Sequence, residues 1–139
     1  TGAGLPGVPL AIAFSEREFH MLDSNGKKTR FLFQVKTALC LDNMVVHHGR
    51  VETFRTAGPF DMVLSRAFAS LQDMVAGCRH LLAPQGCFLA MKGAYPAAEL
   101  EDEDISRQCD VQAVYPLDVP GLDEQRHLVK MTLKRDPGR

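Results

Sequence analysis

Apolar segments of two kinds alternate along this chain, and this alternation constrains its fold more than any other feature. Short runs of strand-like composition are followed by segments whose apolar residues recur every three or four positions, as on one face of a helix. Strands that alternate with helices are typical of a parallel sheet whose strands are joined by helical crossovers. The sequence therefore predicts an α/β fold, with a sheet that carries helices on both faces.

Six segments have the composition of strands and end at turn signals. They are residues 18–23, 44–48, 60–65, 87–92, 111–114 and 127–133. Pro116, Pro120 and Gly121 divide the last two segments, which predicts two closing strands joined by a long turn.

Three segments have helical periodicity. Residues 8–14 are apolar nearly all round, which predicts a short buried helix with Pro9 in its first turn. Residues 26–41 predict an amphipathic helix with the apolar stripe Phe31, Leu32, Val35 and Leu39. Residues 70–82 predict the most regular helix, with an S-x-x-D start and the stripe Leu71, Met74, Val75, Cys78, Leu81 and Leu82. A turn at 83–86 would end this helix. The acidic run 99–104 is expected to be a solvated helix or loop tip with no catalytic or binding role.

Bulk properties narrow the class of protein. A chain of 139 residues with 45% hydrophobic content fits one globular domain, so we expect residues 1–139 to form a single, partial domain. The net charge of −1 argues against general electrostatic attraction to nucleic acid, so any such site must be a local patch. No cysteine pair has C-x-x-C spacing and no apolar run is long enough to cross a bilayer, which is typical of a reduced, cytoplasmic protein.

The chain opens on a glycine-rich loop. Gly2, Gly4 and Gly7 satisfy G-x-G-x-x-G directly before the first expected helix. Such a loop lets a ligand approach the backbone, and the helix after it offers free N–H groups to a carboxylate or phosphate. Asp23 ends the next strand, where a carboxylate can accept both hydroxyls of a ribose. Together these features predict a nucleoside ligand; the alternative is a tight turn followed by an aspartate that caps the next helix.

Further polar residues follow the later strands. Val51 and Glu52 come just after the second expected strand, where the adenine ring lies in doubly wound sheets, although simple exposure also accounts for Glu52. Arg66 follows the third expected strand and has no acidic neighbour in sequence, which favours a ligand over a surface ion pair. A salt bridge from elsewhere in the chain stays open. Lys92 ends the fourth expected strand, so these groups should converge on one rim of the sheet.

Basic residues offer candidates for contact with a phosphate. Lys27, Lys28 and Arg30 begin the expected amphipathic helix, where positive charge is unfavourable to the helix dipole. A phosphate partner explains them as well as does a solvated surface that only aids solubility. His47 and His48 do not predict a metal, because adjacent strand residues point to opposite faces and no third ligand is suitably spaced. We expect no metal site.

Several segments occur in an order that resembles one family. They are TGAGLPGVPL, HMLDSNGKKTRFL, RVE, FDMVLSRAFASL, MKG and QRHLV. Over nearly all of its length the chain resembles the bacterial guanine-N7 methyltransferases of small-subunit ribosomal RNA, also called glucose-inhibited division protein B. The resemblance implies a Rossmann-like fold of the class I S-adenosylmethionine-dependent methyltransferases. It also implies methyl transfer from S-adenosylmethionine to N7 of a guanine in the 530 loop of 16S ribosomal RNA, within the small ribosomal subunit.

The resemblance also implies roles for single residues. Gly4 and Leu5, in the loop of Gly2, would line the methionine end of the cofactor, Asp23 the ribose, Val51 and Glu52 the adenine, and Arg66 the region near the reacting methyl. Lys92, Arg126 and His127 would contact RNA. On the residues alone, Lys27, Lys28 and Arg30 are further candidates for RNA contact, and Tyr95 or Phe68 for stacking on a flipped guanine. Guanine N7 bears a lone pair and no proton, so no general base is expected.

Two other functions stay open on the residues alone. One is an NAD(P)-dependent oxidoreductase, because G-x-G-x-x-G followed by an acidic residue also suits that cofactor. The other is a non-catalytic Rossmann remnant that contacts ribosomal RNA.

In the family the first, central strand precedes the position of Thr1. Without that strand its neighbours would have unpaired backbone groups, so we expect the 139-residue chain alone to be unstable or inactive.

Overall fold

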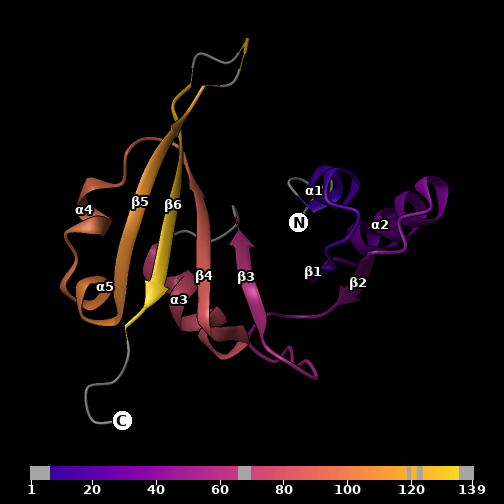
Figure 1. The fold of residues 1–139 in the computed structure, drawn as a ribbon, viewed down its shortest axis with the longest axis horizontal. Helices are drawn as coiled ribbons and strands as arrows, with labels where there is room; N and C mark the ends of the chain where they lie inside the picture. Colours follow the sequence, from indigo (N-terminus) through magenta and orange to yellow (C-terminus); the bar gives the residue numbers. More distant parts are fainter. Residues whose placement is uncertain (1–6, 66–69, 119, 122–123, 135–139) are drawn as a thin grey trace. The chain divides into compact units, whose positions relative to one another are not determined.

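The computed structural model describes residues 7–65, 70–118, 120–121 and 124–134 (Figure 1). The chain divides into two compact units, which we call unit 1 (residues 1–54) and unit 2 (residues 55–139) and describe separately. The described strands form two sheets, one in each unit, and none of them is hydrogen-bonded to strands of both sheets. That residues 1–139 form a single domain stays a prediction.

Unit 1 is a parallel pair of strands with helices on one side. α1 (Gly7–Ala13) precedes β1 (Phe19–Asp23), and α2 (Gly26–Leu39) connects β1 to β2 (Met44–His48) (Figure 1). Side chains of both helices and both strands share one buried cluster, formed by Ala11, Met21, Leu32, Leu41, Met44 and Val46. The predicted strands 18–23 and 44–48 and the crossover helix between them are therefore confirmed.

Local hydrogen bonds explain where the elements of unit 1 begin and end. The Asn25 side chain caps α2 by accepting the backbone N–H groups of Lys27 and Lys28 at 2.9 and 3.2 Å. The helix ends at Leu39, before the predicted Leu41, because Cys40 adopts the left-handed conformation with φ of 53°.

The apolar stripes predicted for the helices of unit 1 are only partly buried, which corrects two expectations. Within α1 only Ala11 is buried, and Ile12 is 55% exposed. Within α2 only Thr29 and Leu32 are buried, whereas Phe31 and Leu39 are about half exposed. The physical reason is the width of the sheet: two strands about 5 Å apart cover only a narrow stripe of each helix.

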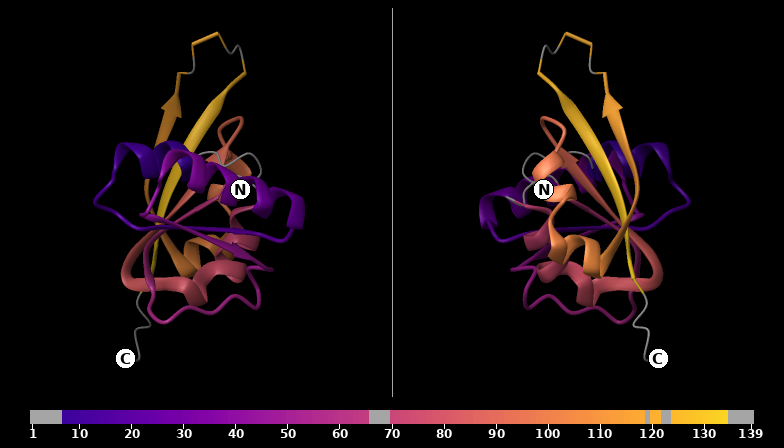
Figure 2. Two further views of the ribbon diagram at one scale, coloured as in Figure 1. Left: turned by 90° about the vertical axis from the view of Figure 1, so that its right-hand side faces the viewer. Right: turned by 90° about the vertical axis from the view of Figure 1, so that its left-hand side faces the viewer.

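Unit 2 is built on a four-stranded mixed sheet in the order β3-β4-β6-β5. Its elements are β3 (Phe60–Ser65), α3 (Leu71–Cys78), η1 (Arg79–Leu81), β4 (Leu82–Lys92), α4 (Ala97–Leu100), α5 (Glu103–Gln108), β5 (Cys109–Leu117) and β6 (Arg126–Leu133). β3 and β4 run parallel, and β6 is antiparallel to both β4 and β5. Figure 2 shows the twist of this sheet and the long β5–β6 pair.

The core of unit 2 buries the stripe predicted for 70–82, but the α-helix is shorter than predicted. α3 ends at Cys78, η1 follows it, and Leu82 already belongs to β4, where it pairs with Phe60 of β3. Every residue of the stripe predicted for 70–82 is buried: Leu71, Met74, Val75, Cys78, Leu81 and Leu82. The helix begins where its sequence signal places it, because the hydroxyl of Ser70 accepts the backbone N–H of Asp73 at 3.1 Å. Phe88 of β4 is the cross-strand partner of Met131 on β6, and neither side chain has exposed surface.

Two further expectations for unit 2 need correction. The segment 83–86 is not a separate turn but an irregular start of β4, since Leu82 pairs with Phe60 and the next partners are Cys87 and Met62. The strand predicted at 111–114 extends over 109–117 and includes Pro116. β5 is an edge strand, where a residue without an N–H group is tolerated. The acidic run is helical and mostly exposed, as predicted: it belongs to the short helices α4 and α5 and to the Asp102 cap between them.

None of the described helices is long and apolar enough to cross a membrane. Cys40, Cys78, Cys87 and Cys109 are free thiols, as expected for a chain without disulfide spacing.

Candidate functional site

The carboxyl ends of β1 and β2 form one edge of unit 1. Asp23 and His48 are partners in register at the ends of these parallel strands, and the N–H of Gly49 donates to the carbonyl of Asp23 at 3.0 Å. The Asp23 carboxylate accepts the backbone N–H of Asn25 at 2.8 Å. Because Asn25 and not Asp23 caps α2, the capping alternative for Asp23 is wrong.

The two residues predicted to contact adenine follow β2 at the same edge. The carbonyl of Arg50 accepts the backbone N–H of Thr53 at 3.2 Å, and that of Val51 accepts the N–H of Phe54 at 3.3 Å, so residues 50–54 form a tight turn. Val51 is half-buried and Glu52 is exposed. The structure therefore brings Asp23, Val51 and Glu52 to one edge, and the exposure of Glu52 fits a ligand contact as well as it fits a solvated side chain.

The glycine loop lies largely outside the described residues. Gly2, Gly4 and Leu5 are among the residues not described, as are Arg66 and Phe68. Gly7 is described and begins α1. A Cβ atom at Gly7 would lie 2.6 Å from the terminal methyl of Met21, which is buried in the core of unit 1. The third glycine of the motif thus permits close contact between helix and strand, which is its role in nucleotide-binding loops.

The basic residues predicted near this edge lie on the surface. Lys27, Lys28 and Arg30 are all exposed in the first turns of α2, which contain no acidic side chain. Their contact with RNA stays a prediction.

A histidine pair lies on the face of the β1–β2 sheet that is opposite the buried cluster. Nδ1 of His20 and Nε2 of His47 are 2.8 Å apart, and Nε2 of His20 is 2.5 Å from Oε1 of Glu18. Burial lowers the pKa of His47, and the neighbouring His20 lowers it further. Phe54 contacts the His47 ring edge-on, at a centroid distance of 4.8 Å. Sequence reasoning missed this cluster because it depends on the strand register, which the residue spacing does not give.

The two neighbouring histidines have different hydrogen-bond partners. His47 contacts His20, whereas Nε2 of His48 donates to the carbonyl of Ser24 at 3.0 Å. Within the described part of the chain, no group of three His, Cys, Asp or Glu side chains is arranged to hold a metal ion.

At the carboxyl end of β4, unit 2 gathers three of the predicted RNA contacts. Lys92 is the register partner of His127, and Arg126 precedes His127 at the start of β6. The Lys92 ammonium is 3.1 Å from Oε2 of Glu99, whose other oxygen accepts the backbone N–H of Leu71 at 2.7 Å. Glu99 therefore joins β4 to the start of α3, and the expectation of a wholly solvated acidic run is wrong for this residue.

Arg126 and His127 differ from Lys92 in their surroundings. Arg126 forms an ion pair with Glu124 at 2.8 Å on the surface. Nδ1 of His127 donates to the carbonyl of Gly93 at 2.7 Å, and the His127 ring meets Tyr95 edge-on. Tyr95 is 55% exposed. This edge thus combines an exposed aromatic ring with a surface cation.

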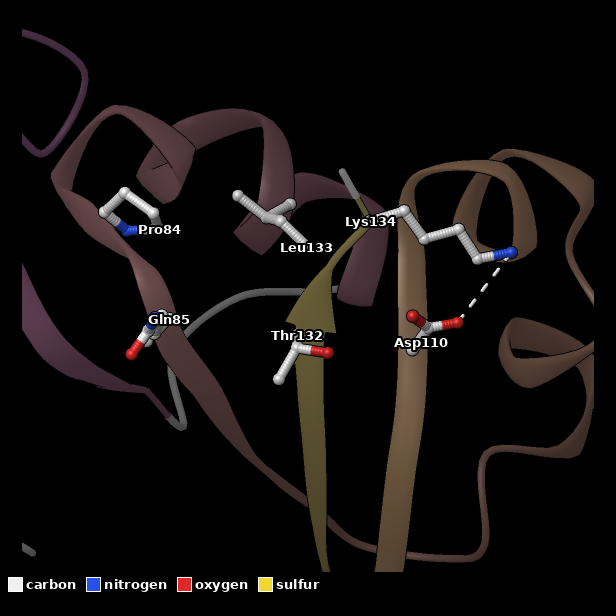
Figure 3. A pocket seen from close by; sticks show the side chains of 7 residues that line it. Pro84, Gln85, Asp110, Thr132, Leu133 and Lys134 are labelled. Carbon is white, nitrogen blue, oxygen red and sulfur yellow. Dashed lines mark ion pairs between the residues drawn. The ribbon is translucent and has the colours of Figure 1, made fainter. Parts of the chain in front are cut away.

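A shallow pocket of about 510 Å³ lies at the opposite end of β4 (Figure 3). Its lining residues are Pro84, Gln85, Gly86, Asp110, Thr132, Leu133 and Lys134. The Lys134 ammonium donates to the carbonyl of Ser106 at 2.6 Å and lies 3.9 Å from Asp110 (Figure 3). Among the described residues that line the pocket, the cation Lys134 joins β6 to α5 and β5, so the pocket has a structural explanation and is not our candidate site.

Known proteins resemble the chain closely in sequence. The model of the GidB family, rRNA small subunit methyltransferase G, matches residues 1–129. Ribosomal RNA small subunit methyltransferase G of Cellvibrio japonicus is 57% identical over 129 residues, which cover 93% of this chain and 58% of that protein. The Nitrosococcus oceani protein of the same name is 50% identical over 135 residues, which cover 97% of this chain and 62% of that protein. The chain thus spans about 60% of the length of these relatives.

Solved structures support the predicted fold. The glycopeptide N-methyltransferase MtfA in complex with S-adenosyl-L-homocysteine superimposes with a TM-score of 0.75 at 15% identity, over 96% of this chain and 80% of MtfA. An rRNA methylase from Streptococcus thermophilus gives a TM-score of 0.65 at 11% identity, over 96% of this chain and 84% of that one. The predicted α/β fold of the class I methyltransferases is therefore confirmed.

Proposed function

Because the chain belongs to the GidB family, rRNA small subunit methyltransferase G, we propose that the complete gene product containing it methylates ribosomal RNA. The reaction is the transfer of a methyl group from S-adenosylmethionine to N7 of a guanine in the 530 loop of 16S ribosomal RNA. The observation that carries this proposal is the family match over residues 1–129. The oxidoreductase and the non-catalytic remnant become outcomes of the test.

The carboxyl edge of unit 1 has the chemistry that a nucleoside requires. The Asp23 carboxylate is oriented by the N–H of Asn25 and would accept the ribose hydroxyls. Val51 would provide apolar contact for the adenine ring, and Glu52 would accept a hydrogen bond from it. Gly7 allows α1 to approach the Met21 side chain of β1, as nucleotide-binding loops require.

S-adenosylmethionine would supply the methyl group from its sulfonium centre and would leave as the neutral thioether S-adenosylhomocysteine. The residues of this chain then have no proton to remove, because guanine N7 attacks through a free lone pair. Their contribution is to hold both reactants in line and to exclude water, and positioning of this kind is worth up to about 7–11 kcal/mol. With a net charge of −1, the chain needs local cations such as Lys27 and Lys28 to hold the RNA.

Methyl transfer tests the proposal directly. The complete gene product is incubated with labelled S-adenosylmethionine and either small ribosomal subunits or 16S RNA. We expect label at N7 of one guanine, and we expect Arg66→Ala to abolish its incorporation. Incorporation at another position, or none with either substrate, contradicts the proposal.

Calorimetry separates the proposed cofactor from NAD. We expect S-adenosylhomocysteine to bind and NAD not to bind; binding of NAD alone favours the oxidoreductase, and binding of neither favours the remnant. Asp23→Ala should weaken S-adenosylhomocysteine by about tenfold or more, since hydrogen bonds to a charged group are worth about 1.5–3 kcal/mol. Asp42→Ala removes an exposed carboxylate of the same unit and serves as the matched control, with no change in affinity expected.

A further inference from the structure

Unit 2 presents an aromatic pair at the carboxyl end of β4. Tyr95 lies in the segment that follows β4, and its ring is edge-on to that of His127, with centroids 5.8 Å apart and planes at 78°. More than half of the Tyr95 surface is exposed. The Tyr95 ring therefore presents a flat face to solvent beside the His127 ring. The cofactor contacts and the methyl transfer proposed above give this face no role.

The backbone beneath this ring is held on both sides. Before Tyr95, the Gly93 carbonyl accepts the Nδ1–H of His127 at 2.7 Å, which ties the segment to β6. After Tyr95, Pro96 is buried, and the Tyr95 carbonyl accepts the N–H of Ala97 at 3.0 Å. A ring on a fixed backbone loses little conformational entropy when a ligand stacks on it.

We propose that the exposed face of Tyr95, supported by His127, stacks on an unpaired base of the substrate RNA. This inference rests on the proposed function and names the part of unit 2 that receives the RNA. Proteins recognise single-stranded RNA by stacking unstacked bases on aromatic side chains, and such contacts tolerate any base.

The charge beside the ring pair favours a nucleotide over an apolar partner. Arg126 adjoins His127 in sequence, and its ion pair with Glu124 lies on the surface, where such pairs are worth little. A phosphate can therefore replace Glu124 as the partner of this guanidinium. The surroundings of Lys92 are different, because its side chain is largely buried and its ammonium holds Glu99 against the start of α3.

The chain contains a matched control for this inference. Its second tyrosine, Tyr115, is 48% exposed and lies on the edge strand β5 of the same unit. Replacing either tyrosine removes a similar exposed ring from unit 2. Tyr115 is the register partner of Leu128 on β6, whereas the Tyr95 ring contacts His127.

The experiment uses the complete gene product and three variants, Tyr95→Ala, Tyr95→Phe and Tyr115→Ala. The KM for the RNA substrate is measured at saturating S-adenosylmethionine, and the Kd for S-adenosylhomocysteine by calorimetry. We expect Tyr95→Ala to raise the KM for RNA about tenfold, as loss of one stacked base predicts. Tyr95→Phe keeps the ring, and neither it nor Tyr115→Ala should change this KM; the Kd for S-adenosylhomocysteine should be the same in all variants.

Three results would overturn the inference. They are an equal KM for Tyr95→Ala and Tyr115→Ala, a KM for Tyr95→Phe as high as that for Tyr95→Ala, and a parallel loss of S-adenosylhomocysteine affinity in Tyr95→Ala. A wild-type protein that methylates no RNA overturns the proposed function first, and this inference with it. Active wild-type protein combined with any of the three results removes the stacking role alone.

Discussion

The two units bury their helices to different depths, although both were predicted from the same kind of apolar pattern. In unit 2 the stripe of α3 is buried throughout, and Phe88 has no exposed surface. In unit 1 the stripe of α2 buries Leu32 but leaves Phe31 and Leu39 about half exposed. Four strands provide a surface that accepts a whole helix face, whereas two parallel strands, which usually occur buried on both faces, do not.

This difference places the candidate cofactor residues on the less buried part of the chain. Asp23, Val51 and Glu52 belong to unit 1, and the aromatic pair proposed to bind RNA belongs to unit 2. Regions that bind ligands are often drawn from the less stable parts of a structure, and a ligand that binds only the folded form stabilises them. Variants of the complete gene product can measure how far the stabilities of the two units differ, since the 139-residue chain alone is expected to be unstable.

The largest effect is expected from the core of unit 2. Phe88→Ala removes a fully buried ring, which should lower the free energy of unfolding by about 3–5 kcal/mol. Urea unfolding followed by circular dichroism measures the change. Met62→Ala, on the exposed surface of the neighbouring strand β3, should change it by about 0.5 kcal/mol or less. Equal losses in the two variants would show that β4 does not form the core of unit 2.

A smaller loss is expected from the core of unit 1. Leu32→Ala removes the most buried apolar residue of α2 and should cost about 2–3 kcal/mol, at the low end for such changes because the cluster around it is small. Leu39→Ala, on the exposed side of the same helix, is its matched control and should be nearly neutral. Hydrogen exchange read by mass spectrometry should show the loss of protection in β1 and β2. If Leu39→Ala costs as much as Leu32→Ala, the exposed side of α2 is covered in solution.

The same comparison explains what the sequence could and could not predict. Strand and helix positions follow from local patterns, so β2 and β3 begin and end at the predicted residues. Burial depends on the width of the sheet, which no local pattern encodes, and this is why α1 and α2 were expected to be more buried than they are. The contacts between Glu18, His20 and His47 depend on register across residues far apart in sequence. Within the candidate site, the position of Asp23 at the end of β1 was predictable from the strand pattern, whereas the ion pair between Lys92 and Glu99 was not.

Removal of a helix cap should lower the free energy of unfolding by less than removal of a core side chain, and by different amounts in the two units. Asn25→Ala removes a cap that accepts two N–H groups in a turn without acidic residues, and should cost about 1 kcal/mol or slightly more. Ser70→Ala should cost about 0.5–1 kcal/mol, because Glu99 still accepts the N–H of Leu71 at the start of α3. Chemical unfolding of both variants checks the order. A larger loss for Ser70→Ala would mean that the carboxylate of Glu99 does not support α3 as the structure indicates.

The smallest effect concerns the pH dependence of unit 1. Burial and then His20 lower the pKa of His47 below 6.5, so the folded chain binds this proton less readily than the unfolded chain does. The contribution of neutral His47 to the free energy of unfolding is therefore complete above pH 6.5. It is lost as the pH falls from there toward the lowered pKa of His47. His47→Phe should flatten the dependence of the unfolding free energy on pH in this window. Val45→Ala, on the same strand, should lower stability equally at every pH. An unchanged slope in His47→Phe would mean that the histidine pair does not form in solution, and hydrogen exchange in β1 and β2 would then respond to acid no more than exchange in β4 and β6.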